Sequence, residues 1–346
     1  MIVNLDYIAD MPTRTKSTKV GLQIPNFTYP DTDQSTLFEK VSDIAVTADT
    51  SGFDTVFVMD HFFQLPLLGT PDLEMFDAYT LLGALAARTS AIRLATLVTG
   101  VTYRNPALLA KSVTTLDVIS RGRAMLGIGA AWFELEHESL GVRFPPVSER
   151  FERLEDALQI CKAMFANKQS TVVGKHHSIT DAWNSPQPVQ AGGPPIMVGG
   201  QGEKKTLRLA AQYADELNTN PSLDQLPHKL EVLQGHLDAL GRDRSTIGVS
   251  CLSSIVMAPT HDEAERKLGD LLRARGVADP STILDDPTAR AAFLPRMLTG
   301  DPDEVTEQAH DLMATGIDGI VVNMPADGHD LASVELVGRT LSAAIS

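Results

Sequence analysis

Asp54-Thr-Val-Phe-Val-Met-Asp60-His61 is the stretch of sequence that decides the fold. The apolar or β-branched run from Thr55 to Met59 is too short for a helix, and its lack of alternation predicts a strand covered on both faces. Asp60 and His61 follow at its carboxyl end, where an α/β barrel collects its chemistry. Taken alone, the pair is better explained by Asp60 capping the next segment and His61 lying hydrogen-bonded at a barrel rim. The rest of the chain changes this balance.

Composition restricts the class of protein. The chain has 346 residues, of which 43% are apolar and 21% charged, as in a globular enzyme. Its formal net charge of −15 argues against nucleic acid and anionic membranes as partners. No stretch has the length of a membrane span and residues 1–18 lack a secretory signal, so we expect a cytoplasmic protein. Cys161 and Cys251 are predicted to be buried, reduced thiols, and no metal-ligand spacing is present.

Short apolar runs alternate with helical patterns along the whole chain. Short connections favour parallel strands with crossover helices, so the fold class is α/β, a single (β/α)8 TIM barrel over residues 1–346. Insertions follow the fourth and seventh strands. The predicted strands are 20–24, 54–60, 92–98, 124–128, 195–198, 215–220, 247–257 and 317–324. The predicted N-terminal extension is 1–18, the insertions are 129–149, 168–193 and 276–300, and the helices include 74–89, 203–213 and 289–298.

Glycines mark two candidate ligand-binding turns. Gly199-Gly200-Gln201-Gly202 ends a strand and opens a helix, an arrangement whose backbone amides and helix dipole suit a phosphate, with Lys204 and Lys205 nearby. A glycine-rich turn without a ligand is the alternative. At the end of the fourth strand, Gly127, Gly129 and Ala130 leave room for a flat ligand, or for close packing of the insertion, or for both.

Hydroxyl groups and one histidine complete the candidate site. Thr96 and Thr99 leave the third strand with side chains that can hydrogen-bond the edge of a heteroaromatic ring. His61 is the one histidine placed at the carboxyl end of a predicted central strand. No serine–histidine–carboxylate set is evident.

The chain resembles the luciferase-like monooxygenase superfamily and, within it, the actinobacterial group of oxidoreductases that use the deazaflavin coenzyme F420. The matching stretches cover most of the chain in the right order. They are 20–25, 52–61, 81–99, 103–106, 116–132, 149–151, 195–202, 213–215 and 316–323.

This resemblance implies roles for individual residues. Asp60 and His61 match a pair whose histidine lies beside the deazaflavin, so both are expected to be catalytic. A strand bulge with a non-proline cis peptide is expected near Thr96-Leu97, behind the ring. The expected cofactor-binding residues are Thr96, Leu97, Thr99, Gly129, Ala130, Gly199, Gly200, Gln201, Gly202 and Asn218; no metal is expected.

The sequence also departs from part of the family. Members that oxidise sugar phosphates have a glutamate where this chain has Ala130, and a tryptophan shortly after the histidine, where this chain reads Phe62-Phe63-Gln64. Oxidation of glucose 6-phosphate is therefore not expected, and the apolar residues after His61 suggest a less polar substrate.

The leading hypothesis is an F420-dependent oxidoreductase that moves a hydride between the deazaflavin C5 and an activated C=C, C=N or C=O group of a small molecule. His61 would position the ring or exchange a proton, Asp60 could orient its imidazole, and Glu134 and Glu136 are alternative proton donors. An FMN-dependent monooxygenase and a non-catalytic cofactor-binding barrel are the alternatives. The resemblance also suggests a homodimer, with 74–89 as a suitable contact helix.

Overall fold

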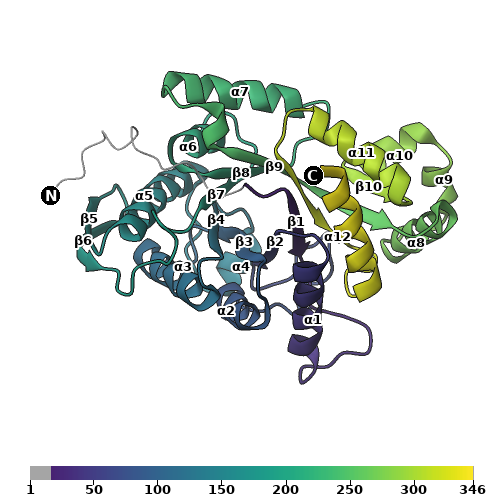
Figure 1. Ribbon diagram of the computed structural model, residues 1–346, viewed down its shortest axis with the longest axis horizontal. Helices are drawn as coiled ribbons and strands as arrows, with labels where there is room; N and C mark the ends of the chain where they lie inside the picture. Colours follow the sequence, from purple (N-terminus) through teal and green to yellow (C-terminus); the bar gives the residue numbers. More distant parts are fainter. Residues whose placement is uncertain (1–16, 346) are drawn as a thin grey trace.

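A closed barrel of eight parallel strands forms the centre of the protein. The structure is a computed structural model that describes residues 17–345. Each strand is hydrogen-bonded to the next in the order β1–β2–β3–β4–β7–β8–β9–β11, and β11 pairs back with β1. This is the predicted (β/α)8 barrel (Figure 1). Its strands are β1 (Val20–Ile24), β2 (Thr55–Asp60), β3 (Arg93–Gly100), β4 (Ala124–Gly129), β7 (Ile196–Gly199), β8 (Glu216–Thr219), β9 (Gly248–Met257) and β11 (Gly319–Asn323).

Helices cover the outside of the barrel, where their apolar faces pack on the strands. None of the helices within residues 17–345 is long and apolar enough to cross a membrane. The helices that follow the barrel strands are α1 (Leu37–Thr50), α2 (Ala78–Arg88), α3 (Pro106–Ser120), α5 (Val147–Ala166), α6 (Thr206–Tyr213), α7 (Leu226–Ala239), α11 (Pro302–Ala314) and α12 (Leu331–Ile345).

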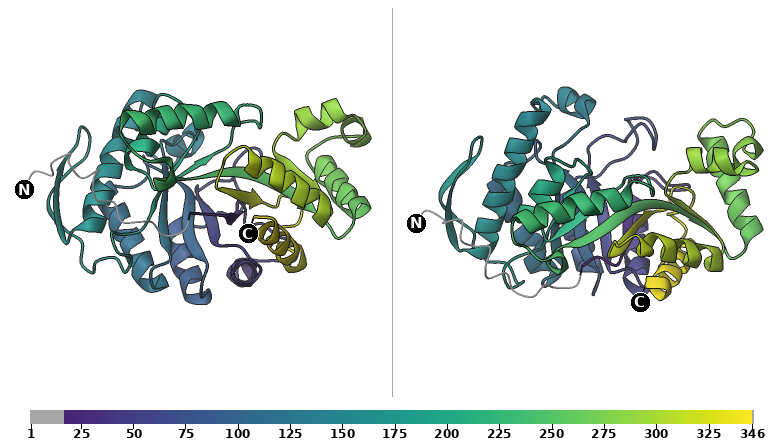
Figure 2. Two further views of the ribbon diagram at one scale, coloured as in Figure 1. Left: turned by 45° about the horizontal axis from the view of Figure 1, so that its top comes forward. Right: turned by 90° about the horizontal axis from the view of Figure 1, so that it is seen from above.

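The insertions after β4 carry two small elements. Residues 129–149 include the short helix α4 (Glu134–Ser139), which returns over the carboxyl end of β2. Residues 168–193 contain an antiparallel hairpin of β5 (Gln169–Val173) and β6 (Ser178–Trp183), which packs on the outer side of α5. The hairpin lies at one end of the molecule, away from the barrel centre (Figures 1 and 2).

The insertion after β9 differs from its prediction. We expected a helix at 289–298, but α10 (Pro287–Phe293) ends earlier and Met297–Gly300 form strand β10. β10 pairs in parallel with β9 from Ser254 to Met257, where β9 extends beyond its barrel neighbours. The backbone groups on that free edge of β9 need partners, and β10 supplies them. With α8 (His261–Ala274) and α9 (Ser281–Leu284), it forms the end of the molecule opposite the hairpin (Figure 2).

Two predicted helices begin later than expected. α2 starts at Ala78 rather than 74, because the Asp77 carboxylate accepts the Thr80 N–H at 2.9 Å and caps the helix there. α6 starts at Thr206 rather than 203, because residues 203–205 form a turn. Both shifts lengthen loops at the carboxyl end of the barrel.

Ion pairs close the amino-terminal end of the barrel. The Arg93 guanidinium lies 3.0 Å from Glu216 and 3.1 Å from Asp54. The Thr18 hydroxyl donates to Glu216 at 2.7 Å, so the end of the predicted extension belongs to the barrel, while residues 1–16 lie outside the described residues. Above this layer the interior is filled by apolar side chains, which leaves chemistry to the carboxyl end. They are Phe57, Ala95, Leu97, Met125, Met197 and Val321.

Both cysteines are buried, free thiols, as the sequence predicts. Burial raises the pKa of Cys161 to about 12 and that of Cys251 to about 11. Because the thiolate is the reactive form, neither should react with a disulfide reagent at about pH 8 while the protein is folded. We expect the reagent to detect no thiol in the native protein and both thiols in denaturant. Fast native reaction at either position would contradict this packing, and Cys161→Ala and Cys251→Ala variants assign the signal.

Candidate functional site

His61 lies at the carboxyl end of β2 with a side chain that is only 12% exposed. Its Nδ1 atom is 3.0 Å from Oε2 of Glu136. The imidazole edge faces two aromatic rings, Trp132 at 5.8 Å and Phe133 at 5.9 Å between centroids. The ring is therefore fixed by a carboxylate on one side and by aromatic packing on another.

Glu136 connects His61 to the neighbouring loops through hydrogen bonds. Its side chain is fully buried, and it accepts the Phe63 N–H at 2.8 Å as well as the Phe62 N–H and the Tyr103 hydroxyl. Burial alone raises the pKa of Glu136, but the hydrogen bonds from His61, Tyr103 and the Phe63 amide outweigh it, and the net shift is downward. The group is therefore a carboxylate that accepts hydrogen bonds, which disfavours the expected alternative role as a proton donor. The other alternative donor, Glu134, is exposed.

A second histidine holds Tyr103 in place. The His137 ring stacks on Tyr103 with centroids 4.4 Å apart. Its Nδ1 lies 2.7 Å from the Phe133 carbonyl and its Nε2 2.6 Å from the Thr102 hydroxyl. Burial lowers the pKa of His137, so the neutral imidazole is favoured, and both ring nitrogens have partners. His137 was not among the predicted site residues, because the sequence places it in a polar insertion.

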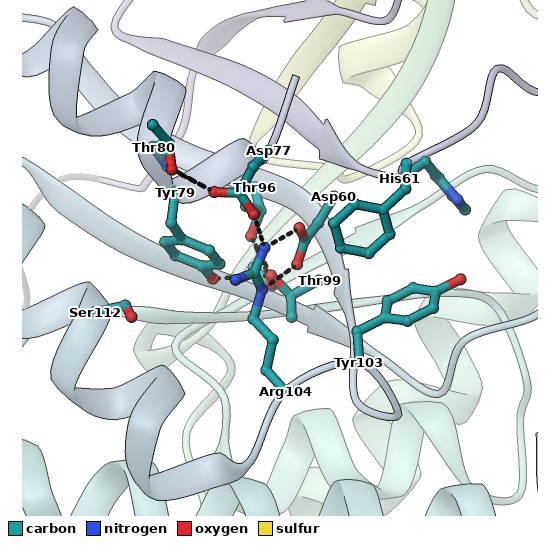
Figure 3. Close-up of polar contacts among 12 residues, drawn as sticks. Asp60, His61, Asp77, Tyr79, Thr80, Thr96, Thr99, Tyr103, Arg104 and Ser112 are labelled. Carbon is teal, nitrogen blue, oxygen red and sulfur yellow. Dashed lines mark hydrogen bonds and ion pairs between the residues drawn. The ribbon is translucent and has the colours of Figure 1, made fainter. Parts of the chain in front are cut away.

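Asp60 does not orient His61. Both of its carboxylate oxygens accept from Arg104, at 2.7 and 3.0 Å, and Arg104 also reaches Asp77 at 2.7 Å. Figure 3 shows Asp60 turned toward Arg104 and His61 turned away from it. The Asp60 side chain is fully buried. Successive residues of a strand point to opposite sides, and this alternation separates the two side chains.

The end of β3 contains the expected bulge. The Leu97–Val98 peptide is cis, one bond beyond the expected position, and the register with β2 and β4 shifts around it. Thr96 donates to the Gly127 carbonyl at 2.8 Å, and Thr99 lies between Thr96 and the Tyr79 hydroxyl, 2.8 Å away (Figure 3). Both threonines are fully buried, so their hydroxyls hold β3 to its neighbours. Leu97 lies in the apolar barrel interior.

The glycines beside this bulge make room for protein atoms. A Cβ on Gly127 would lie 1.8 Å from the Thr96 carbonyl oxygen, and one on Gly129 or Gly199 would lie 2.9 or 2.7 Å from the Val98 side chain. Close packing thus accounts for these three glycines. Ala130 follows at the surface of the strand end and is partly exposed.

Polar side chains line the opposite part of the barrel interior. Ser254 donates to Asn323 at 2.8 Å, Asn323 to Gln23 at 3.2 Å, and Gln23 to the Leu97 carbonyl at 3.3 Å. Asn218, a predicted cofactor contact, donates to Ser250 at 2.9 Å. The carboxyl end therefore combines amide and hydroxyl groups on β1, β8, β9 and β11 with apolar and aromatic groups on β2, β3 and β4.

The predicted phosphate turn lies at the same end of the barrel. Gly200 has a φ of +130°, which favours glycine, and its N–H donates to the Asn218 carbonyl at 3.0 Å. Within residues 17–345, no acceptor is paired with the N–H groups of Gln201 or Gly202. No group of three or more potential metal ligands occurs among the described residues.

Comparison with known proteins places these features in a family. A family model described as luciferase-like monooxygenase matches residues 18–319. An F420-dependent glucose-6-phosphate dehydrogenase from Microbacterium testaceum is 30% identical over 305 residues, which cover 83% of this chain and 87% of that protein. A 5,10-methylenetetrahydromethanopterin reductase from Archaeoglobus fulgidus is 25% identical over 327 residues, 85% of this chain and 92% of that protein.

Solved structures share the fold. The monooxygenase RslO1 from Streptomyces bottropensis aligns with a TM-score of 0.79 at 22% identity, over 95% of this chain and all (100%) of that one. An F420-dependent secondary alcohol dehydrogenase, solved with an F420–acetone adduct, aligns with a TM-score of 0.76 at 21% identity, over 96% and 100%.

The Asp60–Arg104 pair generates a stability prediction. Replacing Arg104 by Met leaves a buried carboxylate without its cation, so we expect the free energy of unfolding to fall by about 3–5 kcal/mol. Denaturant unfolding measures this loss, and adding Asp60→Asn should recover part of it. Arg339→Met is the control. It removes a surface ion pair between Arg339 and Glu335, whose side chains are 71% and 48% exposed, and it should change the free energy of unfolding by less than about 1 kcal/mol. Equal losses from both variants would contradict the assigned roles.

The Gly127 contact generates a second prediction. Gly127→Ala places a methyl group into the backbone of β3, so we expect the free energy of unfolding to fall by about 3 kcal/mol or more. Gly83→Ala is the matched control, since nothing lies within 4 Å of its Cβ and it is inside helix α2. That substitution should be stabilising, by about 0.5–1 kcal/mol. A tolerated Gly127→Ala would show that the bulge does not contact β4 as described.

Proposed function

The chain belongs to the luciferase-like monooxygenase family, and on that basis we propose that it is an F420-dependent oxidoreductase. It would transfer a hydride between C5 of the deazaflavin and an activated C=C, C=N or C=O group of a small organic molecule. The F420-dependent glucose-6-phosphate dehydrogenase supports the cofactor, and it and the 5,10-methylenetetrahydromethanopterin reductase support the class of reaction. The observation that carries the proposal is His61, held at the carboxyl end of β2 by a buried carboxylate.

The residues at the carboxyl end fit a ring with one polar edge. Gln23, Asn218 and Asn323 supply amide groups on one side, and Leu97 and Val98 supply an apolar surface behind them. When bound, the deazaflavin supplies the hydride or accepts it. In this chain His61 would hold or move the accompanying proton, a role suited to an imidazole.

The Gly199–Gly202 turn fits the cofactor phosphate. The backbone N–H groups of Gln201 and Gly202, which have no acceptor among residues 17–345, can donate to an anion. The nearby Glu203 carboxylate is neutralised by Lys229 at 2.7 Å and lies 3.3 Å from His228, so it does not oppose a negative ligand. Lys204 and Lys205 are exposed and add positive charge.

The loop after His61 favours a substrate less polar than a sugar phosphate. The backbone N–H groups of Phe62 and Phe63 donate to Glu136, and the Phe62 ring packs edge-to-face with Tyr103, with centroids 5.3 Å apart. Leu65 and Leu68 follow in the same loop and are partly exposed. An enone, imine or carbonyl compound with an apolar substituent is the substrate class proposed here. Homodimer formation through α2 and a cytoplasmic location stay predictions.

Cofactor titration tests the proposal directly. The purified apoprotein is titrated with F420 and separately with FMN, and fluorescence reports binding. We expect tighter binding of F420, followed by oxidation of reduced F420 in the presence of an enone or imine. Preference for FMN would favour oxygen-dependent chemistry instead, and binding of neither would favour a barrel without this cofactor.

A variant tests the role of His61. His61→Ala should lower turnover by about 10²-fold or more, since general acid–base groups contribute at least that much. His310→Ala changes an exposed histidine on α11 and is the matched control. Circular dichroism should show both variants folded. Unchanged turnover in His61→Ala would remove the imidazole from the reaction.

A further inference from the structure

We infer that Glu136 is a positioning residue that fixes the tautomer of His61, with the proton on Nδ1 and the lone pair on Nε2. The inference deepens the proposed function, because it names which imidazole nitrogen would handle the proton. It rests on the contacts of Glu136 and His61, which are independent of the cofactor.

The Glu136 carboxylate can only accept hydrogen bonds. An ionised carboxylate has only acceptor sites, so every group hydrogen-bonded to it must donate. Three of its partners are donors by their chemistry, namely the N–H groups of Phe62 and Phe63 and the Tyr103 hydroxyl. His61 Nδ1, 3.0 Å from Oε2, is the fourth partner and must carry a proton in this arrangement.

The other nitrogen of His61, Nε2, is left as an acceptor. A neutral imidazole has one N–H, so a proton on Nδ1 leaves Nε2 as an acceptor. Within residues 17–345, Nε2 of His61 has no hydrogen-bond partner, whereas His137 uses both nitrogens on protein atoms. His61 is thus the imidazole of this pair with a nitrogen free to exchange a proton.

A chain of contacts keeps the Glu136 carboxylate in place. Glu136 is held by Tyr103, which is stacked on His137, and His137 is hydrogen-bonded to Thr102 and Phe133. The same carboxylate binds the amides of the loop after His61. Imidazole orientation and loop position therefore depend on one side chain, as in the outer partners that orient a metal-bound histidine.

Nitrogen-15 NMR of the imidazole tests the inference. Protein labelled with ¹⁵N-histidine is recorded in the neutral form of His61, and the signals that disappear in His61→Ala identify the residue. We expect a pyrrole-type shift for Nδ1 and a pyridine-type shift for Nε2. The opposite pattern in the wild-type protein would overturn the inference.

Glu136→Gln provides the sharper arm of this test. The glutamine oxygen can still accept from the Phe62 and Phe63 amides, so its NH₂ group must face His61. That group donates, and Nδ1 must then accept, which moves the proton to Nε2. We expect the tautomer to invert in this variant, with kcat falling at least 10-fold while KM changes less than threefold. Glu134→Gln, on the exposed side of the same helix, should change neither the His61 tautomer nor kcat.

The outcomes separate the inference from the proposed function. An unchanged tautomer in folded Glu136→Gln would overturn the inference even if F420 is the cofactor. An inverted tautomer in a protein that binds no F420 would support it while the proposed function fails. If Glu136→Gln does not fold, Tyr103→Phe serves instead. It removes one donor, leaves the His61 contact, and should keep the proton on Nδ1; loss of that tautomer would count against Glu136.

Discussion

The buried carboxylate of Glu136 is the interaction on which the arrangement of the carboxyl end depends. An ionised group removed from water costs several kcal/mol unless its acceptor sites are filled. Here donors from the loop after β2 and from the segment after β3 fill them. The short helix α4, the aromatic loop and the imidazole therefore form one cooperative unit, because none of them can move without leaving this charge unsatisfied.

Asp60 and His61 are neighbours at the end of β2 but make different kinds of contact. The two residues are adjacent, yet Asp60 is buried against Arg104 and His61 meets Glu136. Arg104 ties β2 to the Asp77 cap of α2 and lies over the Tyr79 ring at 4.7 Å, so Asp60 anchors the outer layer. Because Asp60 makes these structural contacts, His61 does not have to, and within residues 17–345 its Nε2 has no hydrogen-bond partner.

Much of the fold could be predicted from the sequence, because apolar runs without alternation identify buried parallel strands. Two kinds of detail could not. β10 pairs with the part of β9 that extends beyond β8. No local sequence pattern indicates that β9 is longer than its neighbour. Thr96 and Thr99 were expected to contact the ligand because they bring hydroxyl groups to the end of β3, but around the bulge at Leu97–Val98 these hydroxyls bond to each other. Glu136 was identified only as an alternative donor, since its partner His61 is 75 residues away.

Local donors, rather than the charge of the whole protein, decide whether an anionic cofactor can bind here. A formal charge of −15 repels a phosphate at long range, but salt screens that field over about 8 Å. The Gln201 and Gly202 N–H groups have no acceptor within residues 17–345, Lys204 and Lys205 follow in the chain, and Glu203 is paired with Lys229. At the candidate site, the buried Glu136 carboxylate contacts the His61 imidazole, and the neighbouring Asp60 carboxylate is neutralised by Arg104.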